Sequence, residues 1–279
     1  MVSSGVLQKE FDDAVMRPES EIDLVRSWLL ISRLEYPELD EAFCRNELER
    51  LSNRLKKKVS GLSDLRRIAE MMAFVLCEQE GFSGNTKDYY APDNSCLNRV
   101  LNRKTGIPIT LGLVYMEVGR RAGLDVRGIA APGHFIAGVY GAGGRCLMDP
   151  FYRGVVLDEN EFRRRVAVQH GGAGMFGPGL LDSAGPGAIL VRLITNLKGI
   201  YIHMGENVKA LQTVEWIIAL NPDAAPEYRT RGCLYETLGV NELAVRDWVK
   251  YVSLAPSAPD VKMVRLKIEE LRRKGFVLH

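Results

Sequence analysis

The spacing of hydrophobic positions divides the chain into three parts. Between residues 20 and 123 apolar residues recur at intervals of three and four, which predicts helices separated by glycine and proline. Residues 126–158 instead form short runs that favour strands, and a Gly-rich loop between two of them is typical of a hairpin. After Gly187 the pattern is helical again. The predicted helices are 21–33, 40–57, 63–79, 96–104 and 108–122, and the predicted strands are 126–131, 134–140, 145–151 and 154–158.

Two segments lack a clear hydrophobic period. Residues 1–19 have none, so we expect a loosely ordered N-terminus. Residues 170–187 read HGGAGMFGPGLLDSAGPG, and this density of glycine and proline predicts a flexible linker. We therefore expect a domain boundary there, and we expect residues 166–187 to be the most mobile internal part of the chain.

The last third contains an internal repeat with a period of 34 residues, which is typical of tetratricopeptide repeats. We place one repeat at 191–224, a second at 225–258, and a last helix at 260–274 that covers the end of the stack. In such a repeat the alanine lets two helices approach, the glycine lies in the turn between them, and the proline follows the second helix. The equivalent pairs are Tyr201 and Tyr235, Gly205 and Gly239, Ala210 and Ala244, and Pro222 and Pro256.

Composition indicates a soluble globular protein, with 46% hydrophobic and 26% charged residues among 279. A net charge of +2 gives no attraction to nucleic acid or an anionic membrane, so we expect neither partner. No apolar run is long enough for a membrane helix, and the charged N-terminus argues against a signal peptide. We therefore expect a cytoplasmic protein.

The five cysteines have no CxxC spacing, which disfavours a zinc site, and their odd number disfavours a disulfide framework. The four histidines also lack partners at metal-binding spacing. We therefore expect no metal, no cofactor and reduced thiols. The cysteines are Cys44, Cys77, Cys96, Cys146 and Cys233.

His134 and Asp149 are the residues best placed for chemistry. If the hairpin pairs Tyr140 with Arg145, then Asp149 lies opposite Ile136 and on the same face of the sheet as His134. The two become diagonal neighbours, roughly 7–8 Å apart at the backbone. A carboxylate there can orient an imidazole, which is how the base of a nucleophile triad is arranged. A retained structural hydrogen bond between two strands is the alternative.

Three stretches give the chain a family resemblance: LLISRLEYPELD, NSCLNRVLNRKTGIPITLGLVYMEVGRRAGLDVRGIAAPGHF and LMDPFYRG. They resemble the SirB-type branch of the transglutaminase-like superfamily, whose members often carry C-terminal tetratricopeptide repeats. The resemblance implies an α+β fold of the papain and transglutaminase type at 20–169, with N-terminal helices, followed by an all-α repeat tail at 188–279. It also implies bacterial origin, and it assigns the family histidine to His134 and the aspartate to Asp149.

The same resemblance places the family's catalytic cysteine at the start of the core helix, roughly 15 residues before Gly123. That position holds Pro108. Cys96 could lie in the first turn of a short helix, where a thiol is activated, but core packing is the better interpretation. The hydroxyl of Thr110 has no visible activating neighbour.

In the repeats, the inner helices place Arg192, Thr195, Asn196 and Arg229 where they could face a groove. Arginine there could hold a partner's carboxylates through paired hydrogen bonds. The alternative is that the short stack packs on the front domain and leaves no open groove.

Two functions follow from this sequence. The favoured one is a non-catalytic module, or pseudoenzyme, that binds protein partners and acts in regulation. The alternative is a thiol-dependent amide hydrolase or acyl transferase that uses His134, Asp149 and a displaced nucleophile, with Cys96 as the candidate. The replacement of the expected cysteine by Pro108 favours the first.

Overall fold

The computed structural model describes residues 4–169 and 178–276 and divides the chain into two compact units. One unit is Glu19–Leu193, and the other joins Met1–Pro18 to Ile194–His279. The division falls inside helix α8 (Pro186–Met204) and not in the predicted linker at 170–187. Of the stretch expected to be most mobile, residues 170–177 lie outside the described part of the chain, whereas 166–169 end a helix and 178–181 form a 3₁₀ turn.

The unit Glu19–Leu193 begins with helices that start at aspartate caps. Asp23, Asp40 and Asp64 each accept hydrogen bonds from backbone N–H groups in the first turn of the helix that follows. The third helix, predicted to begin at residue 63, begins at Leu65 after this cap. After Ala73 the third helix continues directly as a π-helix. The helices are α2 (Leu24–Ser32), α3 (Glu41–Val59) and α4 (Leu65–Ala73), with the π-helix at Phe74–Gln79.

The core helix α6 (Pro108–Arg121) follows a short helix α5 (Leu97–Arg103). Pro108 occupies its first position, where a missing N–H costs no helical hydrogen bond. Gly123 follows its end with φ +90°, as the left-handed residue of a helix C-terminus requires. Two-residue strands β1 (Ser83–Gly84) and β2 (Thr105–Gly106) pair in parallel before α6.

A four-stranded antiparallel sheet follows, in the order β3-β4-β5-β6. Tyr140 pairs with Arg145, which confirms the predicted register, and Gly141 pairs with Gly144, so the loop has two residues and not four. The strands are β3 (Asp125–Ile129), β4 (Ile136–Gly141), β5 (Gly144–Asp149) and β6 (Val155–Leu157).

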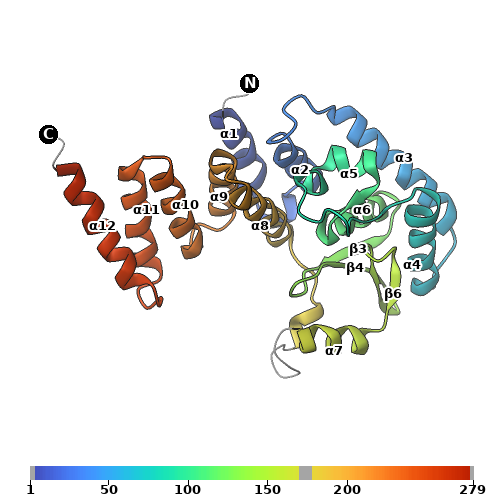
Figure 1. The fold of residues 1–279 in the computed structure, drawn as a ribbon. Helices are drawn as coiled ribbons and strands as arrows, with labels where there is room; N and C mark the ends of the chain where they lie inside the picture. Colours follow the sequence, from blue (N-terminus) through green and yellow to red (C-terminus); the bar gives the residue numbers. More distant parts are fainter. Residues whose placement is uncertain (1–3, 170–177, 277–279) are drawn as a thin grey trace. The chain divides into compact units, whose positions relative to one another are not determined.

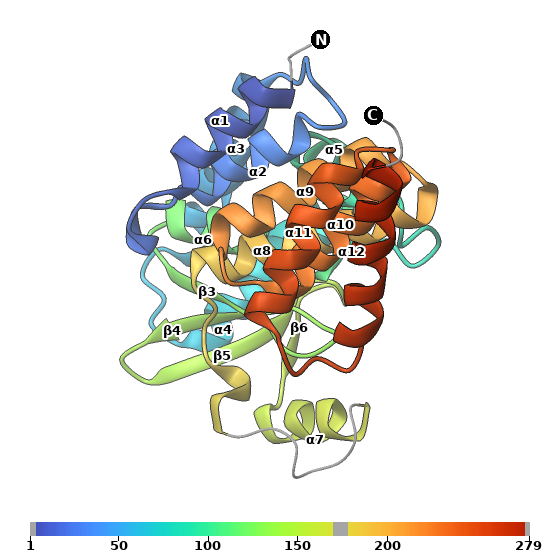
Figure 2. The same ribbon diagram turned by 90° about the vertical axis from the view of Figure 1, so that its left-hand side faces the viewer.

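Helices cover both faces of this sheet. Helix α6 lies over β3 and β4 (Figure 1), and Gly112 and Gly128 allow the close approach because Phe135 lies against both. Helix α7 (Glu159–Gln169) lies on the opposite side of the sheet (Figure 2), where Phe162 and Val166 pack with Ile136 and Leu147. The central strand β4 is therefore almost entirely buried, whereas Arg127 in the middle of β3 and Val155 in β6 remain exposed.

The helices after residue 194 follow the predicted 34-residue repeat. Gly205 and Gly239 lie in equivalent turns with φ +73° and +77°, and Ala210 and Ala244 are both fully buried. The helices are α8, α9 (Asn207–Leu220), α10 (Ala225–Thr237), α11 (Asn241–Leu254) and the terminal α12 (Val261–Phe276).

The N-terminus is helical, so the expectation of a loosely ordered segment is wrong. Helix α1 (Ser4–Val15) packs on α9, and Phe11 stacks on Trp216 with ring centroids 5.0 Å apart. Leu7 and Phe11 are buried because they lie on one face of the helix, together with Ala14 and Val15. Gln212 also donates a hydrogen bond to Gln8.

Candidate functional site

His134 is the last residue of a tight turn that leads into β4. Its N–H donates to the Ala131 carbonyl at 3.1 Å, with Pro132 and Gly133 in the central positions. Gly133 has φ +68°, so proline then glycine is the pattern of a type II turn. The turn places the His134 side chain at the edge of the sheet, two residues before the strand begins.

Asp149 ends β5 and holds the turn that follows it. Its Oδ1 accepts the backbone N–H of Phe151 at 3.0 Å and that of Tyr152 at 3.3 Å. Its carbonyl accepts the N–H of Gly154 at 2.7 Å. The carboxylate is buried. Its bonds to backbone N–H groups hold it in place independently of its contact with any side chain.

The two side chains meet as the register requires, with His134 Nε2 2.6 Å from Asp149 Oδ2. A carboxylate acceptor at Nε2 selects the tautomer protonated there and leaves the lone pair on Nδ1. No described residue hydrogen-bonds Nδ1, and the side chain is 20% exposed. The pair can therefore accept or hold a proton at Nδ1, or bind a ligand there.

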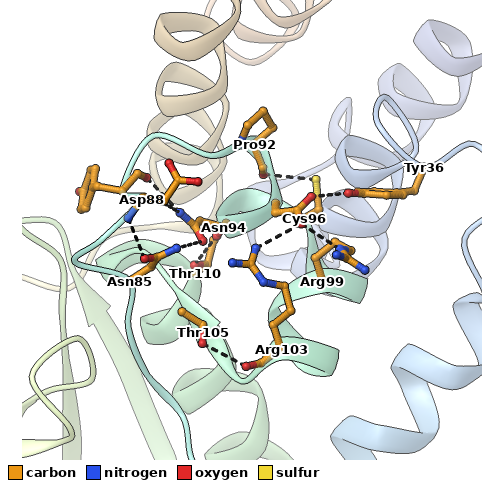
Figure 3. Close-up of polar contacts among 12 residues, drawn as sticks. Tyr36, Asn85, Asp88, Pro92, Asn94, Cys96, Arg99, Arg103, Thr105 and Thr110 are labelled. Atoms are coloured by element: carbon orange, nitrogen blue, oxygen red, sulfur yellow. Dashed lines mark hydrogen bonds and ion pairs between the residues drawn. The ribbon is translucent and has the colours of Figure 1, made fainter.

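The start of α6 carries no activated nucleophile. Pro108 has no reactive side chain, and Thr110 is fully buried. Its hydroxyl accepts the Ile107 N–H at 3.0 Å and lies 2.8 Å from the Asn94 carbonyl, to which it can donate. Figure 3 shows this contact within a network that also includes Asn85. The Thr110 hydroxyl is thus engaged in holding the 85–94 loop.

Cys96 is fully buried immediately before the first turn of α5, and its Sγ lies 3.5 Å from the Pro92 carbonyl (Figure 3). No described cysteine is in hydrogen-bond contact with His134. Burial raises the pKa of Cys77 and of Cys146, and it raises that of Cys44 to about 11. These shifts reduce the thiolate fraction at neutral pH, which is the reverse of activation.

Aromatic side chains around the imidazole were not anticipated from the sequence. The His134 ring lies 6.3 Å from Phe151 and 6.0 Å from Tyr152, and Tyr89 lies 6.1 Å from Phe151. Tyr152 is 61% exposed and Tyr90 is 74% exposed. The available signals were the YY pair in a polar loop and FY directly after Asp149-Pro150, but nothing local shows that the two meet.

The four residues expected to line a repeat groove are divided between the two units. Arg192 lies in the unit Glu19–Leu193, whereas Thr195, Asn196 and Arg229 lie in the other. Arg192 donates to the Ala131 carbonyl, so it is engaged beside the His134 turn. Arg229 is ion-paired with Asp260, and Thr195 is exposed. Arg229 therefore does not present an unpaired guanidinium to a partner.

Two family models match this arrangement of a sheet domain followed by paired helices. The model of the transglutaminase-like superfamily matches residues 42–195, and that of the tetratricopeptide repeat matches residues 197–269. The chain belongs to the transglutaminase-like superfamily. This confirms the expected family and the α+β fold with a helical repeat tail.

Relatives of this transglutaminase-like protein come from bacteria. A UPF0162 protein of Xylella fastidiosa is 33% identical over 261 residues, which are 92% of this chain and 93% of the relative. Protein SirB1 of Salmonella typhimurium is 25% identical over 88% of this chain and 91% of its own length. The UPF0162 protein YchA of Escherichia coli is 27% identical over the same shares. No solved structure matches the chain.

The described residues of this transglutaminase-like protein contain no group of three or more His, Cys, Asp or Glu side chains that could hold a metal ion. Among the helices that the structure describes, none has the length and apolar character to cross a membrane.

Proposed function

We propose that this protein is a non-catalytic transglutaminase-like module that binds protein partners in the cytoplasm and acts in regulation. The start of α6 carries the proposal. The family resemblance puts the nucleophile there, and this chain has Pro108 in that place and a Thr110 hydroxyl used to hold the 85–94 loop. A base without a nucleophile cannot begin acyl transfer.

The His134–Asp149 pair supports a binding role as well as a catalytic one. Asp149 would be required even without chemistry, because it accepts two backbone N–H groups of the turn that presents Tyr152. The exposed aromatic rings beside the imidazole are the kind of side chain that is enriched at protein interfaces. The tetratricopeptide repeats add a second surface suited to proteins.

The alternative is a thiol-dependent amide hydrolase or acyl transferase. One observation favours it: the imidazole is oriented at Nε2 and retains its lone pair at Nδ1, as a general base would be. It requires a thiol to reach His134 in a conformation other than this one, and Cys96 is the candidate.

Cysteine labelling separates the two functions. The native chain is treated with limiting iodoacetamide at mildly acidic pH, and each of the five thiols is quantified by mass spectrometry. We expect Cys233, the exposed thiol, to label slowly and the buried Cys44, Cys77 and Cys96 more slowly still. Rapid labelling of Cys96 that slows in His134→Ala would overturn the non-catalytic proposal, because only an activated thiolate reacts quickly at that pH.

Binding is tested by photo-crosslinking in cells. A photoreactive amino acid is placed at Tyr152, and a matched control carries it at Arg66, which is also exposed but lies on α4. We expect a specific protein adduct from position 152 that is absent from position 66. The same adducts from both positions would count against a binding surface beside His134.

A further inference from the structure

Arg192 is a half-buried cation without a carboxylate partner. Its Nη1 donates to the Ala131 carbonyl at 2.9 Å, and no carboxylate of the described residues lies within ion-pair distance. Burial lowers the pKa of its guanidinium, since the charged form loses hydration. By contrast, Lys198 is paired with Glu227 and Arg231 with Asp247. Burying half of a charge without a counter-ion costs free energy of desolvation, so binding of an anion from outside the chain would stabilise Arg192.

The guanidinium lies beside the candidate site. The Ala131 carbonyl that it contacts also accepts the backbone N–H of His134, so one oxygen links Arg192 to the turn that presents the imidazole. Arg192 also interacts electrostatically with Tyr89, whose own pKa is raised by burial. The Tyr89 ring contacts the Phe151 ring, and the Phe151 ring in turn contacts the His134 ring.

The Arg192 guanidinium can only donate hydrogen bonds, and the hydroxyls of Tyr89 and Tyr152 can donate as well as accept. Among the described residues, the carboxylate nearest to His134 is that of Asp149, and it is already used by His134 and by two backbone N–H groups. A ligand of Arg192 must therefore supply acceptor oxygens, and a carboxylate matches the planar fork of arginine. The rings of Tyr89 and Tyr152 add apolar area for a neighbouring side chain.

We propose that Arg192, together with the rings of Tyr89 and Tyr152, forms a subsite that binds a peptide carboxylate next to His134. This inference rests on the proposed binding function and names the chemistry of its ligand. The carboxylate can come from a polypeptide C-terminus or from a glutamate side chain. The two sources share the same recognition by arginine.

Three dipeptides separate these sources: N-acetyl-Gln-Phe with a free C-terminus, N-acetyl-Glu-Phe-amide, and the neutral N-acetyl-Gln-Phe-amide. Their dissociation constants are measured on the full chain by NMR, with the His134 ring signals as the readout. We expect at least one charged dipeptide to bind about tenfold more tightly than the neutral one, because a hydrogen bond to a charged group contributes that much. Whichever charged dipeptide binds more tightly identifies the source, and equal affinities assign both. Equal binding of all three would overturn the proposal.

Variants assign the effect to Arg192. Arg192→Gln should abolish the preference for the charged dipeptides. The matched control Arg127→Gln, which removes a cation paired with Asp125 on β3, should keep it. If Arg192→Gln does not fold, Arg192→Lys decides, since lysine keeps the charge but cannot form paired bonds: weaker binding supports the proposal, and unchanged binding overturns it. Because these measurements need no thiol chemistry, their failure is distinguishable from that of the non-catalytic function, which the cysteine labelling tests.

Discussion

Asp149 has two functions at the scale of a single residue. One carboxylate oxygen accepts the N–H groups of Phe151 and Tyr152, and the other contacts His134. The side chain is 7% exposed, so removing it leaves buried donors without an acceptor. The turn and the imidazole therefore depend on the same carboxylate, but not to the same degree.

Asp149→Ala should destabilise the protein by about 2–4 kcal/mol, because each unsatisfied buried donor costs about 1–3 kcal/mol. His134→Ala should cost less, about 1–2 kcal/mol, since it removes one hydrogen bond to a carboxylate and leaves the turn intact. Urea unfolding of both variants measures the difference. Equal losses would show that the His134 contact, and not the backbone turn, accounts for the stabilising effect of Asp149.

Glu47 gives a pH-dependent contribution to stability. Hydrogen bonds from Arg50 lower the pKa of Glu47 to about 2, and Lys104 adds to the effect. A depressed pKa in the folded state means a contribution that is present above the unfolded pKa, near 4.5, and is lost as the pH falls towards 2. We expect the free energy of unfolding of the wild type to exceed that of Glu47→Gln by about 1–2 kcal/mol at pH 7, after allowance for screening by water, and this gap to narrow below about pH 4 and to close towards pH 2.

Urea unfolding at pH 7, 4 and 3 measures this gap. Glu41→Gln is the control, because Glu41 is exposed and its ion pair with Arg45 is longer, at 3.7 Å. A gap that stays constant from pH 7 to pH 3 would contradict the assignment to Glu47.

The sequence predicted the contact of His134 with Asp149 but not the residues around it. The contact follows from strand register, which depends on a hairpin of a few residues. Tyr89, Tyr152 and Arg192 come together from a loop, a turn and a helix far apart in the chain. No local sequence pattern predicts that residues so far apart in the chain lie close together. Helical phase alone places Arg192 in the repeat groove, whereas in the structure it contacts the Ala131 carbonyl.

At the scale of elements, α6 and the sheet approach closely because glycines face Phe135. A Cβ at Gly112 would lie 2.5 Å from the Phe135 ring, and one at Gly128 would lie 2.3 Å from it. Phe135 directly follows His134 in the sequence. The packing of its ring therefore also fixes the backbone position from which the imidazole extends. Sequence periodicity predicted the helix but not this contact, since glycine carries no hydrophobic signal.

Gly112→Ala should therefore destabilise the protein by about 1–3 kcal/mol, because the added methyl group overpacks the interface. Gly199→Ala in α8 is the matched control: it is also in a helix, but a Cβ there meets nothing within 4 Å. We expect that variant to be more stable by about 0.5–1 kcal/mol, through helix propensity. Thermal or urea unfolding tests the pair, and a stabilising effect at both positions would show that Phe135 moves aside without cost.

At the scale of the whole molecule, the chain forms two units, and the second contains both termini. The 34-residue repeat was predictable because each turn requires glycine in a left-handed conformation, at Gly205 and again at Gly239. The sequence did not predict that α1 packs in this second unit. Its apolar residues are few, and its partner Trp216 lies more than two hundred residues away along the chain.

Phe11→Ala should loosen the repeat unit selectively. The ring is fully buried against Trp216, and removing such a ring costs about 3–5 kcal/mol. Hydrogen exchange should accelerate in α1 and α9 and remain unchanged in α6. Equal acceleration in α6 would mean that the two units unfold together.

The pairing of α1 with α9 also has a consequence for synthesis on the ribosome. Helix α1 is made before α9, which follows roughly 190 residues later, and that interval takes about 10–40 s at ordinary rates of translation. Throughout that interval Leu7 and Phe11 have no partner from the repeat unit to cover them. The unit Glu19–Leu193 can complete its core while the ribosome is still working. The nascent chain therefore carries the apolar face of α1 uncovered until α9 has been made, and a chaperone that binds short apolar segments could bind this face during that interval.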